Sequence, residues 1–265
     1  MPPLHSHIHS AYVFITMKCM KIALAQIHPC WNDPDASFSM FYQYAKDAKE
    51  RGASLIAFPE QAATGWDPRD NQCFIESIDG SIVSRFRELA RDIGIGVLGS
   101  FREQTDDLPK NTAVLIDRNG GVMLSYSKNH LFYPAHEDQY FSAGDRDETL
   151  VAEMDGFLIG IAICFDLRFC EVFSRYQKAG VELMLIPTAW PVSTIHHMTL
   201  LARSRAVENS CYTACVNITG VTPVNTYDGQ SVVFCPEGDC VCSADSNETL
   251  LIAELREDAF HRRWK

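Results

Sequence analysis

Short apolar runs alternate with helical patterns along most of the chain. Apolar runs predict buried strands at 20–26, 54–60, 94–100, 157–165, 182–190, 211–217, 231–236 and 250–256. Apolar residues at helical spacing predict helices at 37–51, 82–93, 170–179 and 195–209, the first of them ended by Gly52. Two further runs, 111–120 and 121–128, predict a hairpin around Asn119-Gly120.

This alternation predicts an α/β protein whose sheets are covered by helices. The two halves resemble weak copies of one another, each running strand, helix, strand, helix, strand. Because no linker or low-complexity segment divides the chain, we expect a single domain at 20–265. Residues 1–19 lack a regular period, and we expect a disordered or loosely packed extension, with a metal role for its three histidines as the alternative.

Composition and charge exclude several classes of protein. The chain has 265 residues, is 46% hydrophobic and carries a formal net charge of −11. An acidic chain is a poor partner for nucleic acid. No apolar run reaches the roughly 18–20 residues that cross a bilayer, so we expect no membrane partner. Several of the ten cysteines lie in apolar runs, which favours reduced thiols and a cytoplasmic protein.

Three polar residues stand where apolar runs end, and ligands of open α/β folds bind at such positions. Glu60 follows an apolar run that partly desolvates its carboxylate, and the resulting higher pKa suits a general base. A surface carboxylate at the start of a loop would show the same sequence pattern. Lys128 closes the run 121–128, and, taken alone, a lysine at a strand end is usually solvated. Cys164 precedes an abrupt change to Asp-x-Arg, and it is either a nucleophile or a core cysteine.

The segments around these residues resemble the signature segments of the nitrilase superfamily of carbon–nitrogen hydrolases. They read FPE at 58–60, YSKNHLF at 126–132 and CFDLRFCE at 164–171. Supporting segments occur in the family's order: MKIALAQ at 20–26, GSFRE at 99–103, NTAVLIDRNG at 111–120, EDQYFSAGD at 137–145, PTAW at 187–190, RSRAVEN at 203–209 and YDGQSVVFCPEG at 227–238. The resemblance covers about residues 20–256 and implies a four-layer α-β-β-α sandwich that assembles as a homodimer or larger homo-oligomer.

The resemblance implies a Glu–Lys–Cys triad of Glu60, Lys128 and Cys164, with Glu137 as a second carboxylate. Cys164 would attack an amide carbonyl carbon and Glu60 would move the proton. Lys128 and the backbone N–H of Phe165 would hold the oxyanion. This chemistry requires neither a metal nor an organic cofactor.

The substrate pocket is expected to include Phe165, Arg168, Trp190 and Tyr126. Arg168 suits a substrate carboxylate, and a structural pair with an acid is the alternative. The implied partner is a small-molecule amide, either an ω-amide or a short aliphatic amide. N-carbamoyl hydrolysis, a catalytically weak binding protein and a redox sensor using Cys164 and Cys170 are the alternatives.

Two features depart from the family pattern. The segment VNITG at 216–220 stands where many relatives have an Asn-Arg-x-Gly run, which predicts an altered pocket wall. The sequence ends at Lys265, soon after the last predicted strand, whereas many relatives carry a longer tail that contributes to dimer contacts.

Overall fold

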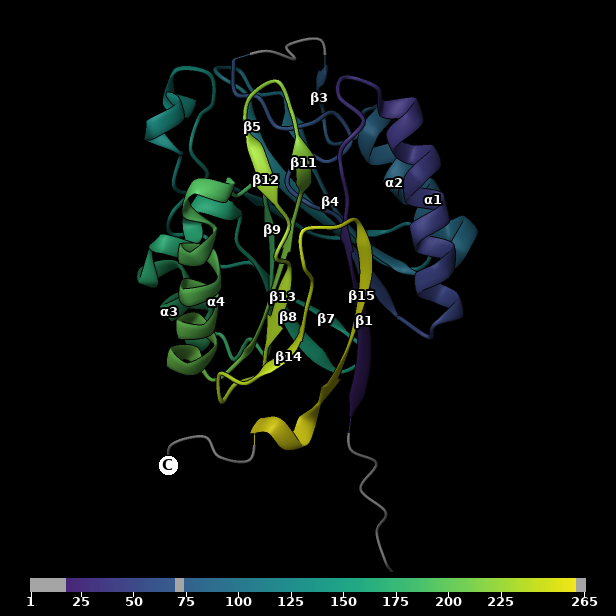
Figure 1. Cartoon of the computed structure of the whole chain (residues 1–265), viewed down its shortest axis with the longest axis vertical. Coiled ribbons are helices and arrows are strands. Elements are labelled where there is room, and N and C mark those ends of the chain that lie inside the picture. The colour runs from purple at the N-terminus through teal and green to yellow at the C-terminus, as the bar shows by residue number, and fades with distance from the viewer. Residues whose placement is uncertain (1–17, 70–73, 261–265) are drawn as a thin grey trace, which may run out of the picture.

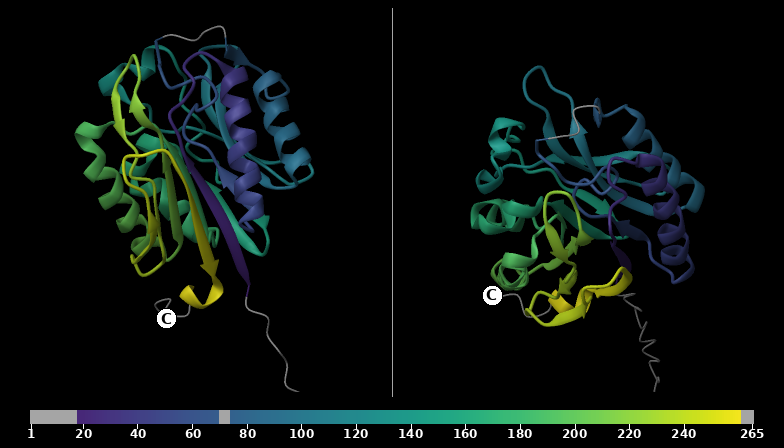
Figure 2. Two further views of the ribbon diagram at one scale, coloured as in Figure 1. Left: turned by 45° about the vertical axis from the view of Figure 1, so that its right-hand side comes forward. Right: turned by 45° about the horizontal axis from the view of Figure 1, so that its top comes forward.

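Two large β-sheets pack face to face between two pairs of helices (Figures 1 and 2). The structure is a computed structural model that describes residues 18–69 and 74–260. Helices α1 (Pro34–Glu50) and α2 (Ser81–Ile93) cover one sheet, and α3 (Cys170–Lys178) and α4 (Ile195–Asn209) cover the other. The α-β-β-α sandwich implied by the resemblance is therefore confirmed.

The sheets are built from strands that lie far apart in the sequence. The order in the first is β15 (Thr249–Arg256), β1 (Cys19–Gln26), β2 (Leu55–Ala57), β4 (Gly96–Glu103), β5 (Lys110–Ile116) and β6 (Val122–Ser127), with β3 (Ile75–Glu76) paired to β4. The order in the second is β14 (Cys240–Ser243), β13 (Val232–Phe234), β10 (Tyr212–Asn217), β9 (Leu183–Thr188), β8 (Phe157–Ile161) and β7 (Ala152–Met154). A hairpin of β11 (Thr219–Val221) and β12 (Thr226–Asp228) lies beside them, and the chain also forms 3-10 turns η2 (Tyr133–Ala135), η3 (Glu137–Gln139), η4 (Cys164–Arg168), η5 (Val192–Thr194) and η6 (Glu257–Phe260).

The two halves of the chain share one topology, as the repeated pattern predicts. In the first half, β1, β2 and β4 are parallel, and β5 and β6 continue the sheet in antiparallel register. In the second half, β8, β9 and β10 are parallel, and β13 and β14 continue in the same way. Corresponding strand ends of the two halves therefore meet where the sheets face one another.

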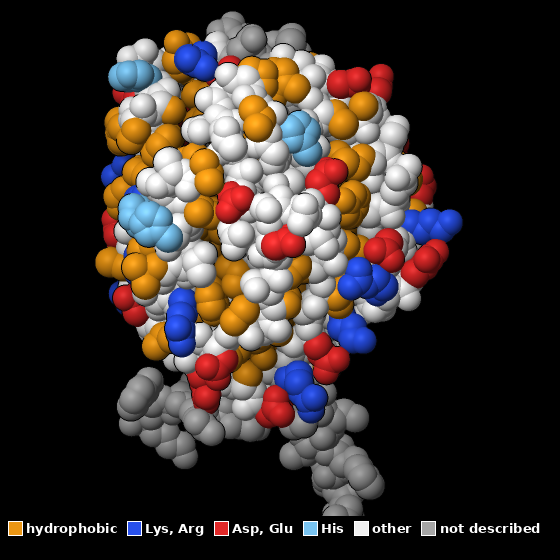
Figure 3. Space-filling view, in the orientation of Figure 1, with side chains coloured by type: hydrophobic (Ala, Val, Ile, Leu, Met, Phe, Trp, Pro, Cys, Tyr) orange, Lys and Arg blue, Asp and Glu red, His pale blue; other side chains and the backbone are white. Residues whose placement is uncertain are grey.

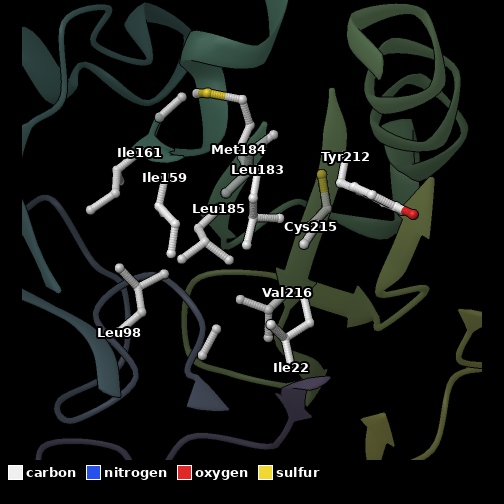
Figure 4. Close-up of a cluster of buried hydrophobic side chains, with 14 of the residues drawn as sticks. Ile22, Leu98, Ile159, Ile161, Leu183, Met184, Leu185, Tyr212, Cys215 and Val216 are labelled. Carbon is white, nitrogen blue, oxygen red and sulfur yellow. The ribbon is translucent and has the colours of Figure 1, made fainter. Parts of the chain in front are cut away.

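Alternating side chains of β1 supply two different cores. Ile22 and Leu24 belong to the cluster between the sheets, whereas Ala23 and Ala25 belong to the cluster under α1 and α2. All four are fully buried, because side chains alternate between the two faces of the sheet and both faces are covered. Figure 4 shows Ile22 and Leu98 of the first sheet beside apolar side chains of the second. The inter-sheet core thus fixes how close the strand ends of the two halves come.

The structure differs from the predicted elements at several boundaries. The strand predicted at 157–165 ends at Ile161, because the chain turns away before the nucleophile candidate, and the strand predicted at 54–60 keeps only 55–57. The first strand begins at Cys19, one residue before the predicted domain. The proposed metal role of His5, His7 and His9 falls outside the described residues. β7, β11, β12 and β14 have three or four residues each, too few to give a readable period.

Two features of the described residues bear on membrane and nucleic-acid partners, namely the character of the helices and the distribution of surface charge. None of the described helices combines the length and apolar character needed to span a bilayer. On the face seen in Figure 3, Lys and Arg side chains are scattered among Asp and Glu rather than gathered into one basic surface.

Phe41→Ala tests the core under α1 and α2. The Phe41 ring stacks on Phe58 at 4.2 Å and meets Phe38 at 5.2 Å. Because these rings are fully buried, the truncation should lower the free energy of unfolding by about 3–5 kcal/mol in urea titration. Leu200→Ala is the control, since Leu200 is 63% exposed and its loss should cost less than about 0.5 kcal/mol. Equal losses in the two variants would contradict this assignment of the core.

Candidate active site

The structure brings Glu60, Lys128, Glu137 and Cys164 together where the sheets face one another. Glu60 lies just past β2, Lys128 directly follows β6, and Glu137 and Cys164 begin η3 and η4. The side chains of Lys128 and both glutamates are at most 1% exposed, and Cys164 is 9% exposed. Four segments from both halves therefore form one buried polar cluster.

Lys128 is held between two carboxylates. Its Nζ donates to Glu60 Oε1 at 3.0 Å and to Glu137 Oε1 and Oε2 at 3.1 and 2.9 Å. Glu137 is fixed in turn, since its Oε2 accepts a hydrogen bond from the Phe132 N–H at 2.6 Å. The ammonium therefore has one defined position.

Glu60 is also anchored by the second half of the chain. Its Oε2 accepts a hydrogen bond from the Ala189 N–H at 3.0 Å, and its own N–H donates to the Thr188 carbonyl oxygen at 3.4 Å. Both partners lie at the end of β9, the strand that corresponds to β2 in the repeated topology. The Glu60 carboxylate also lies close enough to Cys164 to raise the pKa of the thiol. The carboxylate therefore interacts with both the lysine and the thiol.

Burial and neighbouring charges shift the pKa values of these groups. Burial raises the pKa of Glu60 above its ordinary 4.5, and Glu137 adds to this, whereas Lys128 acts in the opposite direction. Burial and the Glu60 carboxylate hold the pKa of the Cys164 thiol well above its ordinary value. Burial alone would lower the pKa of Lys128, but the two carboxylates outweigh it and the net pKa is raised. The site therefore pairs a protonated thiol and a cationic lysine with a carboxylate of increased basicity.

A buried aspartate shapes the turn that carries Cys164. Cys164 has φ +46°, a conformation that L residues rarely adopt, at the start of η4. Asp166 is fully buried and accepts hydrogen bonds from the Ile163, Asn129 and His130 N–H groups, the Tyr126 hydroxyl and the His130 ring. Because all of these donors except the Ile163 N–H come from β6 and the segment after it, Asp166 connects the turn that carries Cys164 to the strand that precedes Lys128.

A narrow pocket reaches Cys164, and a wider cleft lies at its mouth. The inner pocket has a volume of about 20 Å³, and its walls include Lys128, Cys164 and three predicted pocket residues, namely Phe165, Arg168 and Trp190. The outer cleft has a volume of about 730 Å³ and shares the walls formed by Phe165 and Arg168. Trp66 also lines both spaces, and no sequence pattern marks it, because only the tertiary structure brings its loop over the site.

Tyr126 does not take the predicted place in the substrate pocket. Its ring is buried in the inter-sheet core, and its hydroxyl donates to Asp166 Oδ2 at 2.9 Å. The position along β6 explains the difference, because Tyr126 lies within the strand, whereas Lys128 lies on the same face but past the end of the strand. Tyr126 therefore supports the turn at Asp166 rather than the pocket wall.

Trp190 forms a rigid part of the wall. Its indole N–H donates to the Thr194 carbonyl oxygen at 2.9 Å, and its backbone N–H donates to Asn217 Oδ1 at 2.8 Å. The Asn217 amide in turn donates to the carbonyl oxygens of Trp190 and Gly229. Asn217 belongs to the segment 216–220 that departs from the family pattern, and it still supports this wall.

Arg168 lies at the boundary between the two spaces. Its guanidinium lies 5.1 Å from the Trp190 ring centroid and 5.6 Å from that of Phe165, and Nη2 lies 3.1 Å from His197 Nδ1. Among the described residues, no carboxylate forms an ion pair with it. The guanidinium edge is therefore available to an anionic group in the cleft.

Elsewhere in the described part of the chain, nucleophilic and titratable groups do not build a second centre of this kind. Within residues 18–69 and 74–260, no three His, Cys, Asp or Glu side chains gather as metal ligands would. Cys170, the partner considered for a redox pair, is exposed, and its Sγ lies 3.8 Å from Glu171 Oε2.

Comparisons with known proteins identify the family to which this chain is similar. A family model described as carbon-nitrogen hydrolase matches residues 21–261. A 2-oxoglutaramate amidase of Bacillus subtilis is 27% identical over 241 residues, which cover 91% of this chain and 90% of that protein. An omega-amidase of Xenopus tropicalis is 29% identical, with 79% of each protein covered.

A solved structure points the same way. The crystal structure of an amidase from Nesterenkonia sp. superposes with a TM-score of 0.81 at 30% identity, covering 92% of this chain and 93% of that one. A variant of that amidase carries the acetamide moiety of fluoroacetamide on its active-site cysteine.

Asp166→Ala tests whether this carboxylate holds the turn. The change leaves several buried N–H and O–H donors unpaired, so the free energy of unfolding should fall by about 3–5 kcal/mol. Alkylation of Cys164 by iodoacetamide, followed by peptide mass spectrometry, should slow because the thiol loses its orientation. Asp79→Ala is the control, since the Asp79 side chain is 85% exposed and its ion pair with Arg87 should contribute at most about 1 kcal/mol. Unchanged stability and alkylation in Asp166→Ala would disprove the role.

Proposed function

The chain belongs to the carbon–nitrogen hydrolase family, and we propose that this amidase hydrolyses an ω-amide of a dicarboxylic acid, or a short aliphatic amide, to a carboxylate and ammonia. The observation that carries the proposal is the buried Lys128, held by Glu60 and Glu137 beside the Cys164 thiol. A cation, a base and a nucleophile at the end of a narrow pocket are the groups that acyl transfer from nitrogen requires.

The first half of the reaction transfers the acyl group to sulfur. Cys164 Sγ attacks the amide carbonyl carbon while Glu60 accepts the thiol proton. The carbonyl oxygen becomes an oxyanion, which Lys128 Nζ and the Phe165 N–H stabilise. This N–H lies in the first turn of η4, where backbone donors lack intrahelical partners. The C–N bond then breaks, the proton on Glu60 passes to the leaving nitrogen, and ammonia and a thioester remain.

The second half returns the enzyme to its starting state. Glu60 accepts a proton from water as the water oxygen attacks the thioester carbonyl carbon. The same donors hold the second oxyanion, the C–S bond breaks, and the proton returns to the sulfur. Glu137 keeps Lys128 in position through both steps, because both of its carboxylate oxygens accept hydrogen bonds from Lys128 Nζ.

Arg168 supports a substrate that bears a carboxylate. It lies at the mouth of the pocket, and the outer cleft is also lined by Arg69 and by the rings of Trp66 and Phe132. A short chain with an amide at one end and a carboxylate at the other would place the amide at Cys164 and the anion near Arg168. The names of the omega-amidase and 2-oxoglutaramate amidase relatives support the same substrate class. An N-carbamoyl amino acid also carries a carboxylate and is the competing substrate.

A substrate panel tests the reaction. Ammonia release is measured with glutaramate-type ω-amides, propionamide and N-carbamoyl amino acids. We expect the ω-amide to give the highest kcat/KM and Cys164→Ala to abolish turnover, a loss of at least about 10³-fold, because the thioester can no longer form. Release that persists in Cys164→Ala would rule out the thiol mechanism, and a preference for the N-carbamoyl compounds would select the alternative.

Arg168→Gln tests the recognition of the carboxylate. Loss of a charge-assisted hydrogen bond should raise KM for the ω-amide by about 10-fold or more and leave KM for propionamide unchanged. Arg203→Gln is the matched control, since Arg203 lines a separate groove beside α4 and β13. An equal effect of Arg168→Gln on both substrates would assign the guanidinium a structural role instead.

A further inference from the structure

Asn111, near the start of β5, contacts every charged member of the triad cluster. Its side-chain Nδ2 donates to Glu60 Oε1 at 2.7 Å and lies 3.5 Å from Glu137 Oε1. Its carbonyl oxygen accepts a hydrogen bond from the Lys128 N–H at 2.9 Å. The residue is fully buried and is not among the residues that line the inner pocket. Asn111 therefore contacts the catalytic residues but does not contact the substrate.

The two carboxylates dictate how the Asn111 amide is turned. Carboxylate oxygens only accept hydrogen bonds, so the amide nitrogen must face them. The consequence is that Asn111 Oδ1 points into the protein interior, where it is buried without a hydrogen-bond partner. An unpaired buried carbonyl oxygen destabilises a fold. An asparagine that serves packing alone would be better replaced by leucine, so the amide donor must serve the site.

The donor acts on a carboxylate that is crowded by other groups. Glu60 faces Lys128 from the end of β6, Glu137 from η3, Cys164 from η4 and the Tyr227 hydroxyl from β12. Among these, Glu137 favours the protonated form of Glu60, and Lys128 opposes it. When Lys128 Nζ donates a hydrogen bond to the substrate oxyanion, its own hydrogen bond to Glu60 weakens. Asn111 is a neutral donor that stays on Oε1 throughout.

We propose that Asn111 is a positioning residue that keeps Glu60 ionised and aimed at the Cys164 thiol. The inference rests on the proposed amide hydrolysis, in which Glu60 is the base. Because a hydrogen bond to a carboxylate favours its charged form, loss of the donor raises the pKa of Glu60. Activity requires ionised Glu60, so the acidic limb of the pH profile then moves to higher pH.

Asn111→Leu tests the proposal, since leucine has a similar volume and removes both the donor and the unpaired oxygen. We expect the acidic limb of kcat/KM to move up by about one pH unit, with roughly tenfold lower kcat on that limb. KM should be unchanged, because Asn111 does not line the pocket. The thermal midpoint should be retained, because Glu60 Oε1 and Glu137 Oε1 still accept hydrogen bonds from Lys128 Nζ and the loss of the unpaired Asn111 oxygen offsets the loss of the donor. Asn111→Ser is the second variant, and its shorter side chain should give the same shift if Asn111→Leu does not fold.

Alkylation of Cys164 by iodoacetamide gives a readout that needs no substrate. Its rate is followed against pH by peptide mass spectrometry, and its acidic limb should move by the same amount. Asn209→Leu is the matched control, because Asn209 is a buried asparagine that donates to the Arg205 carbonyl oxygen within α4. That variant should lose thermal stability and keep the wild-type pH profile.

The outcomes separate this inference from the proposed function. If the acidic limbs of kcat/KM and of the alkylation rate both move to higher pH and the thermal midpoint is retained, the role of Asn111 is supported. Wild-type profiles in Asn111→Leu or Asn111→Ser, or a loss of kcat that only follows lost stability, overturn it. If the wild-type protein hydrolyses no amide while the alkylation limb still shifts, the proposed function fails and the role of Asn111 beside Glu60 and Cys164 stands.

Discussion

A lysine buried between two carboxylates is the constraint on which the rest of the site depends. Lys128, Glu60 and Glu137 are almost fully shielded from water, so each charge must be balanced within the protein. Removal of Lys128 would leave two buried carboxylates without a counter-charge, which is far more destabilising than loss of a surface ion pair. The cluster therefore forms only when β2, β6 and η3 have all reached their places. Its geometry is a product of the whole fold rather than of one loop.

Much of this arrangement could be predicted from the sequence because its signals are local. Glu60 and Lys128 follow apolar runs directly, and the hairpin around Asn119-Gly120 was predicted from its turn residues and confirmed. The repeated order of strands and helices predicted that both halves share a topology. The family resemblance then supplied Glu137 and the two-sheet architecture, which alternation alone does not distinguish from a single sheet.

The rest depends on contacts that no local pattern encodes. Asp166 reads as a polar residue after a strand, and only the approach of β6 turns it into the anchor of the Cys164 turn. Tyr126 was predicted in the pocket because it is near Lys128 in sequence, whereas strand geometry directs its hydroxyl to Asp166. Asn111 and Trp66 gave no signal, since their partners lie far along the chain. The positive φ of Cys164 likewise interrupts an apolar run that otherwise predicts a continuous strand.

The meeting of β2 and β9 gives the two halves a division of labour. The first half carries the carboxylates and the lysine, and the second carries the thiol and the Ala189 N–H that binds Glu60. Each half alone thus holds an incomplete set of reactive groups. In this respect the two halves resemble two subunits that complete one active site at their interface. During synthesis, the thiol emerges after the base and the lysine, and Glu60 cannot accept its proton until the sheets dock. Chemical activation is thereby coupled to completed folding, and a nascent or misfolded chain carries no more reactive a nucleophile than any other cysteine.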